Sequence, residues 1–448
     1  MWAQTVELPK TLPSTVHRLS KIFQPINVLP KHAQVKSELT SKSQRLMLDL
    51  GIIRQASPGS FYLLPLGVRA LDKLVSLVDK QLSKINAQKV ILPSLTNSNL
   101  WKSTGRLQDY GLELFTLNDR HGHKYVLSPT HEEAVSDLVA SVAQMSYKEF
   151  PLKLYQITNK YRDEIKPRFG LMRGRQFIMK DLYSFDVDVK KAKETYEEVC
   201  ECYNSIFDEI GVKYIKVAGS CGAMGGLLSH EYHYNADIGE DKITSCLDCG
   251  FFANAELAGS DKCSHCAGSN IKIVSGIEVG HTFLLGEKYS KPLKAQYLTE
   301  ARALVPLQMG SYGLGITRII AAAIEVLATE NEIRWPLSLA PFAVLIIPPK
   351  KGSKEEAMGN YSVHRLHNQL ESLQPFKGNI LLDDRTHMTI GRRLVDARRV
   401  GYPFIIIIGN KSVEQTPIFE VNNLASDQTL FLSEEGLLAY FKNILKIN

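Results

Sequence analysis

The sequence lacks several features that would decide its class at once. No apolar run reaches the length of about 18 residues that a membrane-spanning helix needs, so no membrane partner is expected. The N-terminus has no apolar core of about 7–15 residues, which argues against a secretory signal. The glycine-rich stretch at residues 219–226 lacks the lysine of a P-loop, and we expect it to form an ordinary loop.

Acidic residues are scarce at the start of the chain. Residues 1–45 contain seven lysines and arginines but only two acidic residues, Glu7 and Glu38. This composition is typical of an organellar transit peptide. A disordered arm or a part of the folded protein is an equally good interpretation of the same segment.

The remaining composition is that of an ordinary globular protein. The chain has 448 residues, of which 44% are hydrophobic and 22% are charged, and it predicts two or three domains. The formal net charge of +6 suits a polyanionic partner.

Residues 161–185, which read YRDEIKPRFGLMRGRQFIMKDLYSF, combine basic, acidic and aromatic side chains. Arg162 and Glu164 are two positions apart and would project from one face of a strand. A loop follows, and Arg173 and Phe177 then begin a second strand-like run. Guanidinium groups bind phosphate and carboxylate oxygens, while a ring and a carboxylate suit a base. The stretch predicts an ATP-binding hairpin, although a solvated surface hairpin would show the same charges.

The same stretch resembles motif 2 of the class II aminoacyl-tRNA synthetases, and its wording is most similar to the prolyl-tRNA synthetases. The family pattern is an aromatic residue, Arg, any residue and Glu, then a loop and Arg-x-x-x-Phe. The resemblance implies that Arg162 holds the α-phosphate of ATP and the carboxylate of the amino acid. It also implies that Glu164 meets the adenine amino group, that Arg173 holds the γ-phosphate and that Phe177 stacks on the adenine.

A helix and a strand containing proline precede this hairpin. Apolar residues recur at spacings of three and four between Val68 and Leu82, which predicts the helix. Residues 90–93 predict a strand at an edge or an interface, because proline removes a ladder hydrogen bond. Together with LWKSTGR at residues 100–106, the segment 68–93 resembles motif 1 of the prolyl enzymes, which implies a homodimer.

Residues 128–135, SPTHEEAV, have two interpretations that are compatible. Thr130 can cap the following helix at its N-terminus, with Glu133 closing a capping box. That leaves Glu132 without a role. In the prolyl family a Thr-x-Glu loop at this place reads the amine of the substrate, so the resemblance implies that Thr130 and Glu132 bind L-proline.

Residues 276–283 are similar to the family's GIEVGH-x-F. The resemblance implies that Glu278 binds the Mg²⁺ that accompanies ATP, since a hard cation takes carboxylate and phosphate oxygens. It also implies that His281 and Phe283 line the pyrrolidine pocket. The family usually continues with Gln-Leu-Gly, whereas Leu284 stands here, so no hydrogen bond from that glutamine is carried over.

Residues 305–325 resemble motif 3, which is rich in glycine and ends in an arginine that opens a helix. The resemblance implies that Arg318 sandwiches the adenine opposite Phe177 and reaches the γ-phosphate, and that Ser311 contacts the substrate. The catalytic residues would then be three arginines that position and neutralise the reactants, since the reaction needs no protein nucleophile. These are Arg162, Arg173 and Arg318.

Four of the seven cysteines form two CxxC pairs that are separated by 13 residues, Cys246 with Cys249 and Cys263 with Cys266. Such paired knuckles are typical of a structural zinc ribbon, although this gap is slightly short, and His265 is a spare donor. Four free thiols are an equally good interpretation.

The segment at residues 212–270 is short for the family. Bacterial prolyl enzymes carry a long insertion in this region, which hydrolyses mischarged alanyl-tRNA. We therefore expect no editing domain, and we expect the chain to misactivate alanine without clearing alanyl-tRNA in cis.

The pattern changes beyond the two prolines of residues 335–341. Strands are expected at 343–348, 379–384 and 404–409, and they alternate with helices at 354–373 and 390–400. This region resembles the anticodon-binding domain of class IIa synthetases, which implies tRNA(Pro) as a partner. Five arginines could contact its phosphates, although a solvated helix face is the commoner use of each. They are Arg385, Arg392, Arg393, Arg398 and Arg399.

These observations predict an α+β fold, with an antiparallel class II catalytic sheet flanked by helices over residues 46–338 and an α/β anticodon-binding domain over residues 342–448. The resemblance implies ligation of L-proline to tRNA(Pro) through a prolyl-adenylate, with ATP and Mg²⁺, for translation in the mitochondrial matrix. Two rivals remain, namely a synthetase for another amino acid such as threonine and a non-catalytic nucleic-acid-binding relative. The presence of every ATP-binding side chain of motifs 2 and 3 argues against the second.

Overall fold

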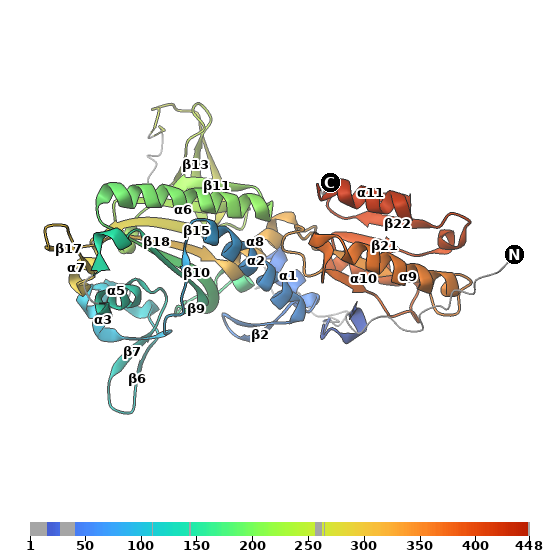
Figure 1. Ribbon diagram of the computed structural model, residues 1–448, viewed down its shortest axis with the longest axis horizontal. Coiled ribbons are helices and arrows are strands. Elements are labelled where there is room, and N and C mark those ends of the chain that lie inside the picture. Colours follow the sequence, from blue (N-terminus) through green and yellow to red (C-terminus); the bar gives the residue numbers. More distant parts are fainter. Residues whose placement is uncertain are drawn as a thin grey trace.

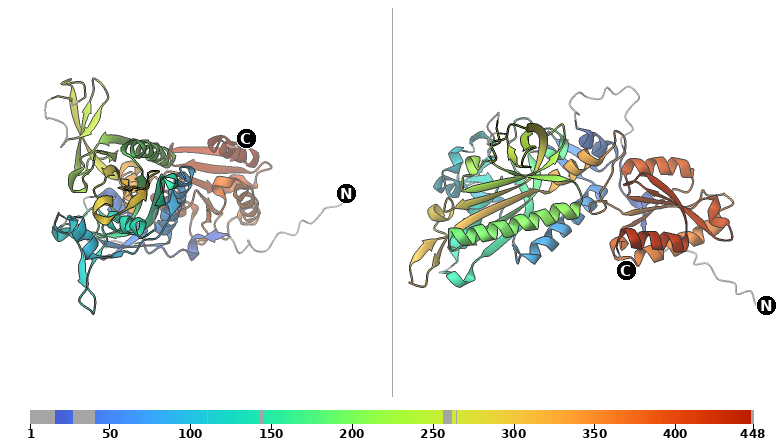
Figure 2. Two further views of the ribbon diagram at one scale, coloured as in Figure 1. Left: turned by 60° about the vertical axis from the view of Figure 1, so that its left-hand side comes forward. Right: turned by 90° about the horizontal axis from the view of Figure 1, so that it is seen from above.

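The computed structural model describes residues 16–26, 41–109, 111–142, 145–255, 262–263 and 265–446. It has two bodies, each built on its own sheet (Figures 1 and 2). A nine-stranded sheet carries the first body, and a six-stranded sheet carries the second, which contains the C-terminal part of the chain. Within the described residues, no helix combines the length and the apolar character that crossing a membrane would require.

The nine-stranded sheet is antiparallel apart from two short parallel pairings, β4 with β9 and β11 with β14. Successive side chains of a strand point to opposite faces, so the sheet offers one face to helices and one to the site. In spatial order the strands are β12 (Leu228–Asn235), β11 (Tyr214–Ala218), β14 (Phe252–Asn254), β13 (Asp241–Cys246), β15 (Ile271–Gly286), β18 (Gln308–Gly315), β10 (Gln176–Asp186), β9 (Leu152–Tyr161) and β4 (Gln88–Lys89).

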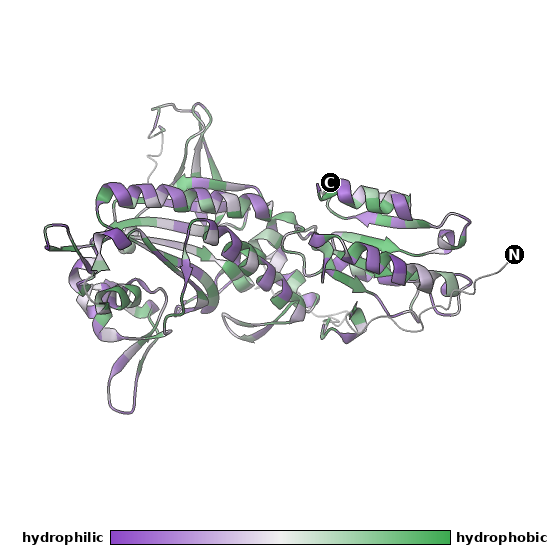
Figure 3. Ribbon diagram, in the orientation of Figure 1, coloured by the Kyte–Doolittle hydropathy of each residue, from purple (hydrophilic) through white to green (hydrophobic). Residues whose placement is uncertain are grey.

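Three long helices form the layer on one face, namely α2 (Pro65–Lys84), α6 (Val189–Ile210) and α8 (Ile316–Leu327). α6 and α8 pack on the sheet and α2 packs against both helices (Figure 1). The expected periodic helix is confirmed as α2, in which Leu74 and Val78 are buried, although Val68 in its first turn is exposed. Hydrophobic and hydrophilic residues both occur along α6 (Figure 3), as a helix with one buried face requires.

Shorter elements frame the opposite face of the sheet. The helix α5 packs there, because Val135 and Val139 join Tyr183 and Phe185 of β10 in one cluster. The elements of this side are α3 (Ser98–Ser103), α4 (Arg106–Asp109), α5 (Glu132–Ser141), α7 (Ser290–Leu293) and the small sheets β5 (Leu95–Asn97), β7 (Lys124–Leu127), β6 (Thr116–Asn118) and β17 (Leu304–Pro306), β16 (Gln296–Leu298), β8 (Met145–Ser146).

The expectation of a strand at residues 90–93 is wrong, since β4 ends at Lys89 and its backbone hydrogen bonds to β9 end with that from the Val90 N–H to the carbonyl of Tyr155 (2.8 Å). The N–H of Leu92 donates to the side-chain oxygen of Gln156 (3.0 Å) instead of to a strand carbonyl. Pro93 has no N–H to donate, so a side chain replaces the ladder where the chain leaves the sheet.

The C-terminal sheet confirms the alternation of strands and helices. Its order is β1-β20-β19-β21-β22-β23, with β1, β20, β19 and β21 parallel and the last two strands antiparallel. The elements are β19 (Val344–Ile347), α9 (Glu356–Glu371), β20 (Ile380–Leu382), α10 (Ile390–Val400), β21 (Phe404–Ile407), β22 (Ile418–Asn423), β23 (Gln428–Ser433) and α11 (Glu434–Ile444).

The five arginines of this domain differ in what they can contact. The phosphate interpretation is wrong for Arg393, which is fully buried and donates to two backbone carbonyls. Arg385 and Arg398 each bridge two carboxylates. Arg399 is half-buried, and the side chain of Arg392 is 64% exposed and only loosely paired. Of the five, Arg392 is therefore the best placed to meet a phosphate.

Residues 16–26 belong to the fold. β1 (His17–Arg18) adds a parallel strand to β20, and Val16 beside it is buried. The backbone N–H of Ser20 donates to the carboxylate of Asp384 (2.9 Å). This stretch is therefore part of the folded protein, which was one of the alternatives for the basic segment.

The expected boundary after residue 45 falls inside a helix, α1 (Lys42–Asp49). Ser41 caps this helix and donates to Glu325 of α8 (2.9 Å), which ties it to the first body, where the hairpin β2 (Ile53–Ser57) and β3 (Ser60–Leu63) follows. The rest of the basic segment, residues 1–15 and 27–40, lies outside the described residues, and so does a transit peptide confined to it.

Candidate active site

The hairpin of β9 and β10 ends at a cleft. The two strands pair up to Tyr161 and Gln176, and the N–H of Arg162 then donates to the carbonyl of Arg175 (2.9 Å). Arg162 and Glu164 follow the end of β9, so the expectation that they project from a strand is wrong. Both nevertheless line the same cleft.

The cleft has two continuous parts. The first, of about 240 Å³, is lined by the residues that the sequence assigned to ATP: Arg162, Glu164, Arg173, Phe177, Glu278 and Arg318. The second, of about 250 Å³, is lined by those assigned to the amino acid: Thr130, Glu132, Arg162, His281, Phe283 and Ser311. Arg162, Phe177, Glu278 and Arg318 line both parts, so every predicted nucleotide and amino-acid residue meets in one hollow.

Arg162 lies where the two parts meet. Its guanidinium carbon is 5.2 Å from the centroid of the Phe177 ring. Its buried Nε finds no hydrogen-bond partner among the described residues. A buried donor without an acceptor is costly, so an anion beside it would be favoured.

Arg173 is held by two carboxylates. Its Nε lies 3.0 Å from Glu164, and its Nη1 forms an ion pair with Glu240, which also pairs with Arg168. The hydrogen bond with Glu164 and the contact with Glu240 raise the pKa of Arg173. Any phosphate that Arg173 binds must therefore compete with these carboxylates.

Arg318 is fixed by backbone carbonyls at the start of α8. Its Nε donates to the carbonyl of Met172 (2.7 Å) and its Nη1 to the carbonyl of Glu278 (3.0 Å). Burial would by itself raise the pKa of Glu278, but the hydrogen bond with His281 (2.8 Å) and the charge of Arg318 bring it down to about 2. An ionised carboxylate at this place fits a hard cation such as Mg²⁺.

The carboxylate of Glu132 is held by hydroxyl groups in the second part of the cleft. Its Oε1 accepts a hydrogen bond from Ser311 (2.8 Å), and its Oε2 accepts one from Thr130 (2.5 Å). Glu132 is buried, so these bonds fix its orientation before any ligand arrives.

The capping box expected for Thr130 and Glu133 is wrong. α5 begins at Glu132, and its N-cap residue His131 makes no side-chain cap. Thr130 donates to the Glu132 side chain, and Glu133 pairs with Arg106 (3.1 Å) instead of reaching back along the helix. Charged partners in a buried place outcompete the cap, because charge-assisted hydrogen bonds are the stronger ones.

His281 lines the second part of the cleft and contacts Glu278, which lines both parts. Its Nδ1 faces Glu278 (2.8 Å) and its Nε2 faces the hydroxyl of Ser229 (2.6 Å). Its ring stacks on Phe283 with the centroids 3.9 Å apart. The imidazole is thus held at both ring nitrogens and on one face, so it forms a rigid wall of the pocket.

Among the lining residues of the cleft that were not found from the sequence are the acidic Asp181, Glu240 and Asp241. Asp181 is 2% exposed and pairs with Lys160 of the neighbouring strand (2.7 Å). A charged residue inside the otherwise strand-like run of β10 was the available signal for it. Glu240 and Asp241 offered none, because they lie far along the chain from the residues that they face.

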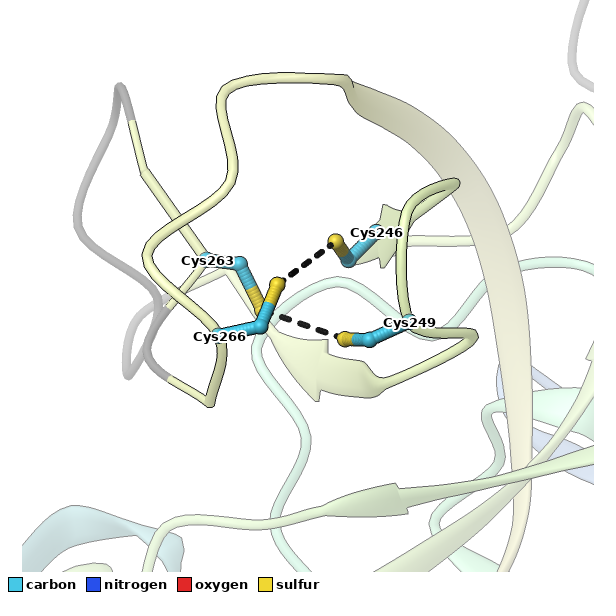
Figure 4. Close-up of side chains that lie close together, drawn as sticks. All are labelled: Cys246, Cys249, Cys263 and Cys266. Atoms are coloured by element: carbon cyan, nitrogen blue, oxygen red, sulfur yellow. Dashed lines mark hydrogen bonds between the residues drawn. The ribbon is translucent and has the colours of Figure 1, made fainter.

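The four cysteines of the CxxC pairs meet at the end of a projecting hairpin (Figures 1 and 4). Their sulfurs lie within 4.8 Å of one another, and two of the separations are 3.6 and 3.7 Å. Zinc with Zn–S bonds of about 2.3 Å in a tetrahedron needs S···S edges of about 3.8 Å. The donor set and its spacing therefore fit zinc. The spare donor His265 is not part of the group, and its ring stacks on Phe251 with the centroids 5.3 Å apart.

Comparison with known proteins agrees with this architecture. Residues 115–327 match the family described as tRNA synthetase class II core domain (G, H, P, S and T), and residues 343–444 match the family described as anticodon binding domain. A protein of Rattus norvegicus named probable proline--tRNA ligase, mitochondrial, is 48% identical over 429 residues, which cover 94% of this chain and 90% of that protein.

A proline--tRNA ligase of Maridesulfovibrio salexigens is 30% identical over 580 aligned positions, which cover 95% of this chain and 97% of that protein. That alignment is far longer than the 448 residues of this chain, so the bacterial protein has additional residues inside the matched region.

Among solved structures, a prolyl-tRNA synthetase of Giardia lamblia in complex with prolyl-adenylate superposes with a TM-score of 0.74. The match covers 89% of this chain and 75% of that one at 17% identity, and it shows the fold. The predicted class II catalytic sheet and its anticodon-binding domain are thus confirmed, and the chain belongs to the prolyl-tRNA synthetase family of class II aminoacyl-tRNA synthetases.

Proposed function

We propose that the cleft activates L-proline with ATP and that the protein transfers the prolyl group to tRNA(Pro). One observation carries this proposal. The Glu132 carboxylate and the hydroxyls of Thr130 and Ser311 form an acceptor site for a secondary ammonium, in the same hollow as the phosphate-binding residues Arg162 and Arg318.

In the first step the carboxylate of proline attacks the α-phosphorus of ATP in line, and pyrophosphate leaves. Arg162 would hold both the attacking carboxylate and the α-phosphate, since it lines both parts of the cleft. Arg173 and Arg318 would stabilise the charge that collects on the leaving pyrophosphate. Glu278 would hold Mg²⁺, which supplies further charge neutralisation at the phosphates.

In the second step the terminal ribose hydroxyl of the tRNA attacks the prolyl carbonyl, and AMP leaves. His281 and Phe283 would keep the ring of the substrate in place as one wall of the pocket. No protein nucleophile takes part in either step.

The test is amino-acid-dependent exchange of pyrophosphate into ATP with proline, alanine and threonine compared. Proline-dependent exchange is expected. Exchange with threonine alone would be consistent with the assigned fold and would contradict the assignment of the amino-acid site to proline. Folded protein that exchanges with none of the three would overturn the activity.

We infer that the protein acts in the mitochondrial matrix, for organellar translation. The support is the mitochondrial name of the relative that is 48% identical. Import of the radiolabelled full chain into isolated mitochondria, followed by separation of the matrix fraction, tests this. Chain that stays accessible to added protease would contradict it.

We infer a homodimer that forms through the motif 1 segment. Its support is Ile91, which is 86% exposed and follows β4 at the edge of the sheet. A large apolar side chain left so exposed fits an interface. Sedimentation equilibrium should give twice the mass of the 448-residue chain, and a monomer at micromolar concentration would contradict this inference.

We infer that the chain has no domain for editing in cis. Between β12 and β15 the described residues form only the short strands β13 and β14 and the cysteine group, and the longer bacterial relative has its additional residues inside the matched region. Purified protein should leave alanyl-tRNA(Pro) intact, and rapid deacylation would contradict this.

We infer that the four cysteines bind one zinc ion that stabilises the hairpin. Elemental analysis should find one zinc per chain, and Cys249→Ser should lose it. Cys221→Ser is the matched control, because Cys221 lies outside the group. Full zinc content in Cys249→Ser, or none in the unsubstituted protein, would contradict the assignment.

A further inference from the structure

The guanidinium group of Arg106 lies directly behind Glu132 and is fully buried. It comes from the short helix α4, 26 residues before its partner. Its Nη1 donates to Glu132 Oε2 and to both carboxylate oxygens of Glu133, each at 3.1 Å. One buried cation is thus shared by two neighbouring carboxylates.

Aromatic rings and a thioether also surround this group. The guanidinium carbon of Arg106 lies 4.8 Å from the ring centroid of Trp101 and 5.3 Å from that of Tyr289. Its Nη2 lies 3.2 Å from the sulfur of Met224, and the Tyr289 hydroxyl donates to the Met224 carbonyl (3.1 Å). A planar cation between these groups has little freedom to move.

The charges around Glu132 explain what Arg106 does. Two adjacent buried carboxylates would not both stay ionised without a cation, because each disfavours the charge of the other. Burial raises the pKa of Glu133, and the Arg106 charge opposes that rise. The nearby Lys160 and Asp181 pair with each other (2.7 Å) and add no net charge. The charge of Lys288, which also interacts with both glutamates, is opposed by that of Asp109. One negative charge is left over at Glu132, and the ammonium of proline carries the positive charge that matches it.

We propose that Arg106 is a positioning residue for substrate selection, which fixes the carboxylate of Glu132 and turns it toward the cyclic ammonium of the substrate. The inference rests on the proposed function, in which Glu132 binds that ammonium. Arg106 itself lines neither part of the cleft among the described residues, so it acts through the lining residues that it contacts, Met224 and the charged Glu132.

The first experiment compares Arg106→Met and Arg106→Lys in pyrophosphate exchange. Arg106→Met should raise the KM for proline about 10- to 100-fold, because a charge-assisted bond is lost and a buried charge pair is broken. The KM for ATP should stay within about twofold, since the contacts described above for Arg106 are with residues outside the nucleotide part of the cleft. Arg106→Lys should recover part of the proline affinity, because it keeps the charge but not the fork. Arg120→Met, at an exposed arginine, is the matched control.

A second measurement uses tetrahydrofuran-2-carboxylic acid, in which oxygen replaces the ring nitrogen of proline. It has no ammonium, so its inhibition constant should change little in Arg106→Met while the KM for proline rises. In a Glu132→Gln background the Arg106→Met change should add little further loss, because the two residues act as one unit.

The outcomes separate this proposal from the function on which it rests. Absence of proline-dependent exchange in the unsubstituted protein would contradict the proposed function itself. Given exchange, equal rises in the KM values of proline and ATP, or equal loss of proline and its oxygen analogue, would show a general structural role and overturn the positioning role. If Arg106→Met does not fold, Arg106→Lys provides the test. The change in its KM for proline is then compared with the change in the inhibition constant of the oxygen analogue.

Discussion

Arg162 is one of the four residues that line both the nucleotide part and the amino-acid part of the cleft. Its ring contact with Phe177 holds the guanidinium in place, and its buried Nε still has a hydrogen bond to give. A group so placed can hold the attacking carboxylate and the α-phosphate in line, which is the main demand of the first step.

We expect Arg162→Ala to lower the rate of adenylate formation about a thousandfold, through lost positioning and lost charge. Proline-dependent pyrophosphate exchange measures this, with Arg120→Ala as an exposed control. A variant that keeps a tenth or more of the rate would remove Arg162 from the role.

Glu240 competes with a phosphate for Arg173, because the ion pair between Glu240 and Arg173 must open before Arg173 can bind a phosphate. We expect Glu240→Gln to lower the KM for ATP about two- to fivefold, the value of a partly exposed ion pair, and to leave the KM for proline unchanged. Glu194→Gln, which breaks an exposed pair on α6, is the control. A rise in the KM for ATP would mean that Glu240 helps to bind the nucleotide.

At the scale of elements, the sequence predicted best what depends on neighbours in the chain. The helix α2 follows from its own apolar period, and Gly211 at the end of α6 has φ +82°, which glycine adopts readily. The prediction of a strand at residues 90–93 failed because the backbone there binds the side chain of Gln156, which lies on β9. An apolar stretch in the sequence does not show which distant side chain it will contact.

The site divides in the same way. Arg162, Phe177 and Arg318 belong to ordered motifs, and the structure places them in one cleft. Glu240 lies 67 residues from Arg173, so no local pattern joins them. The side chains that the family shares could be predicted from the sequence. The partners that orient or restrain those side chains become visible only in the folded structure.

The junction of β10 and α6 contains a buried carboxylate that makes stability depend on pH. Asp186 accepts a hydrogen bond from Thr195 of α6 (2.8 Å), but its Oδ2 has no partner among the described residues. Burial raises the pKa of Asp186 to about 6. The folded protein therefore binds more protons than the unfolded chain between about pH 4 and 6, and stability falls as the pH rises through that range.

We expect Asp186→Asn to gain stability relative to the unsubstituted protein as the pH rises from 4 to 7, by about 1–3 kcal/mol. Thermal unfolding of both proteins at pH 4, 5.5 and 7 measures the difference, with Asp208→Asn on the exposed side of α6 as the control. A difference that is constant with pH would contradict the assignment.

At the scale of the whole molecule, residues 16–26 connect the two bodies. β1 extends the C-terminal sheet, while the side chain of Gln24 donates to the carbonyl of Leu50 in the first body (2.8 Å). The helix α2 meets the same junction, because Arg69 donates to the carbonyls of Pro341 (2.8 Å) and Gly378 (2.7 Å). The orientation of the anticodon-binding domain thus depends on a segment from the other end of the chain.

This arrangement predicts where an N-terminal targeting segment can end. Removal of residues 1–26 should destabilise the C-terminal body by roughly 2 kcal/mol or more relative to a chain that lacks residues 1–15 alone, because the buried Val16 and the β1 ladder are lost. Calorimetry and hydrogen exchange in β20 measure this. The chain isolated from mitochondria should accordingly begin before His17, and a mature chain that begins after residue 26 with full stability would show that the segment is dispensable.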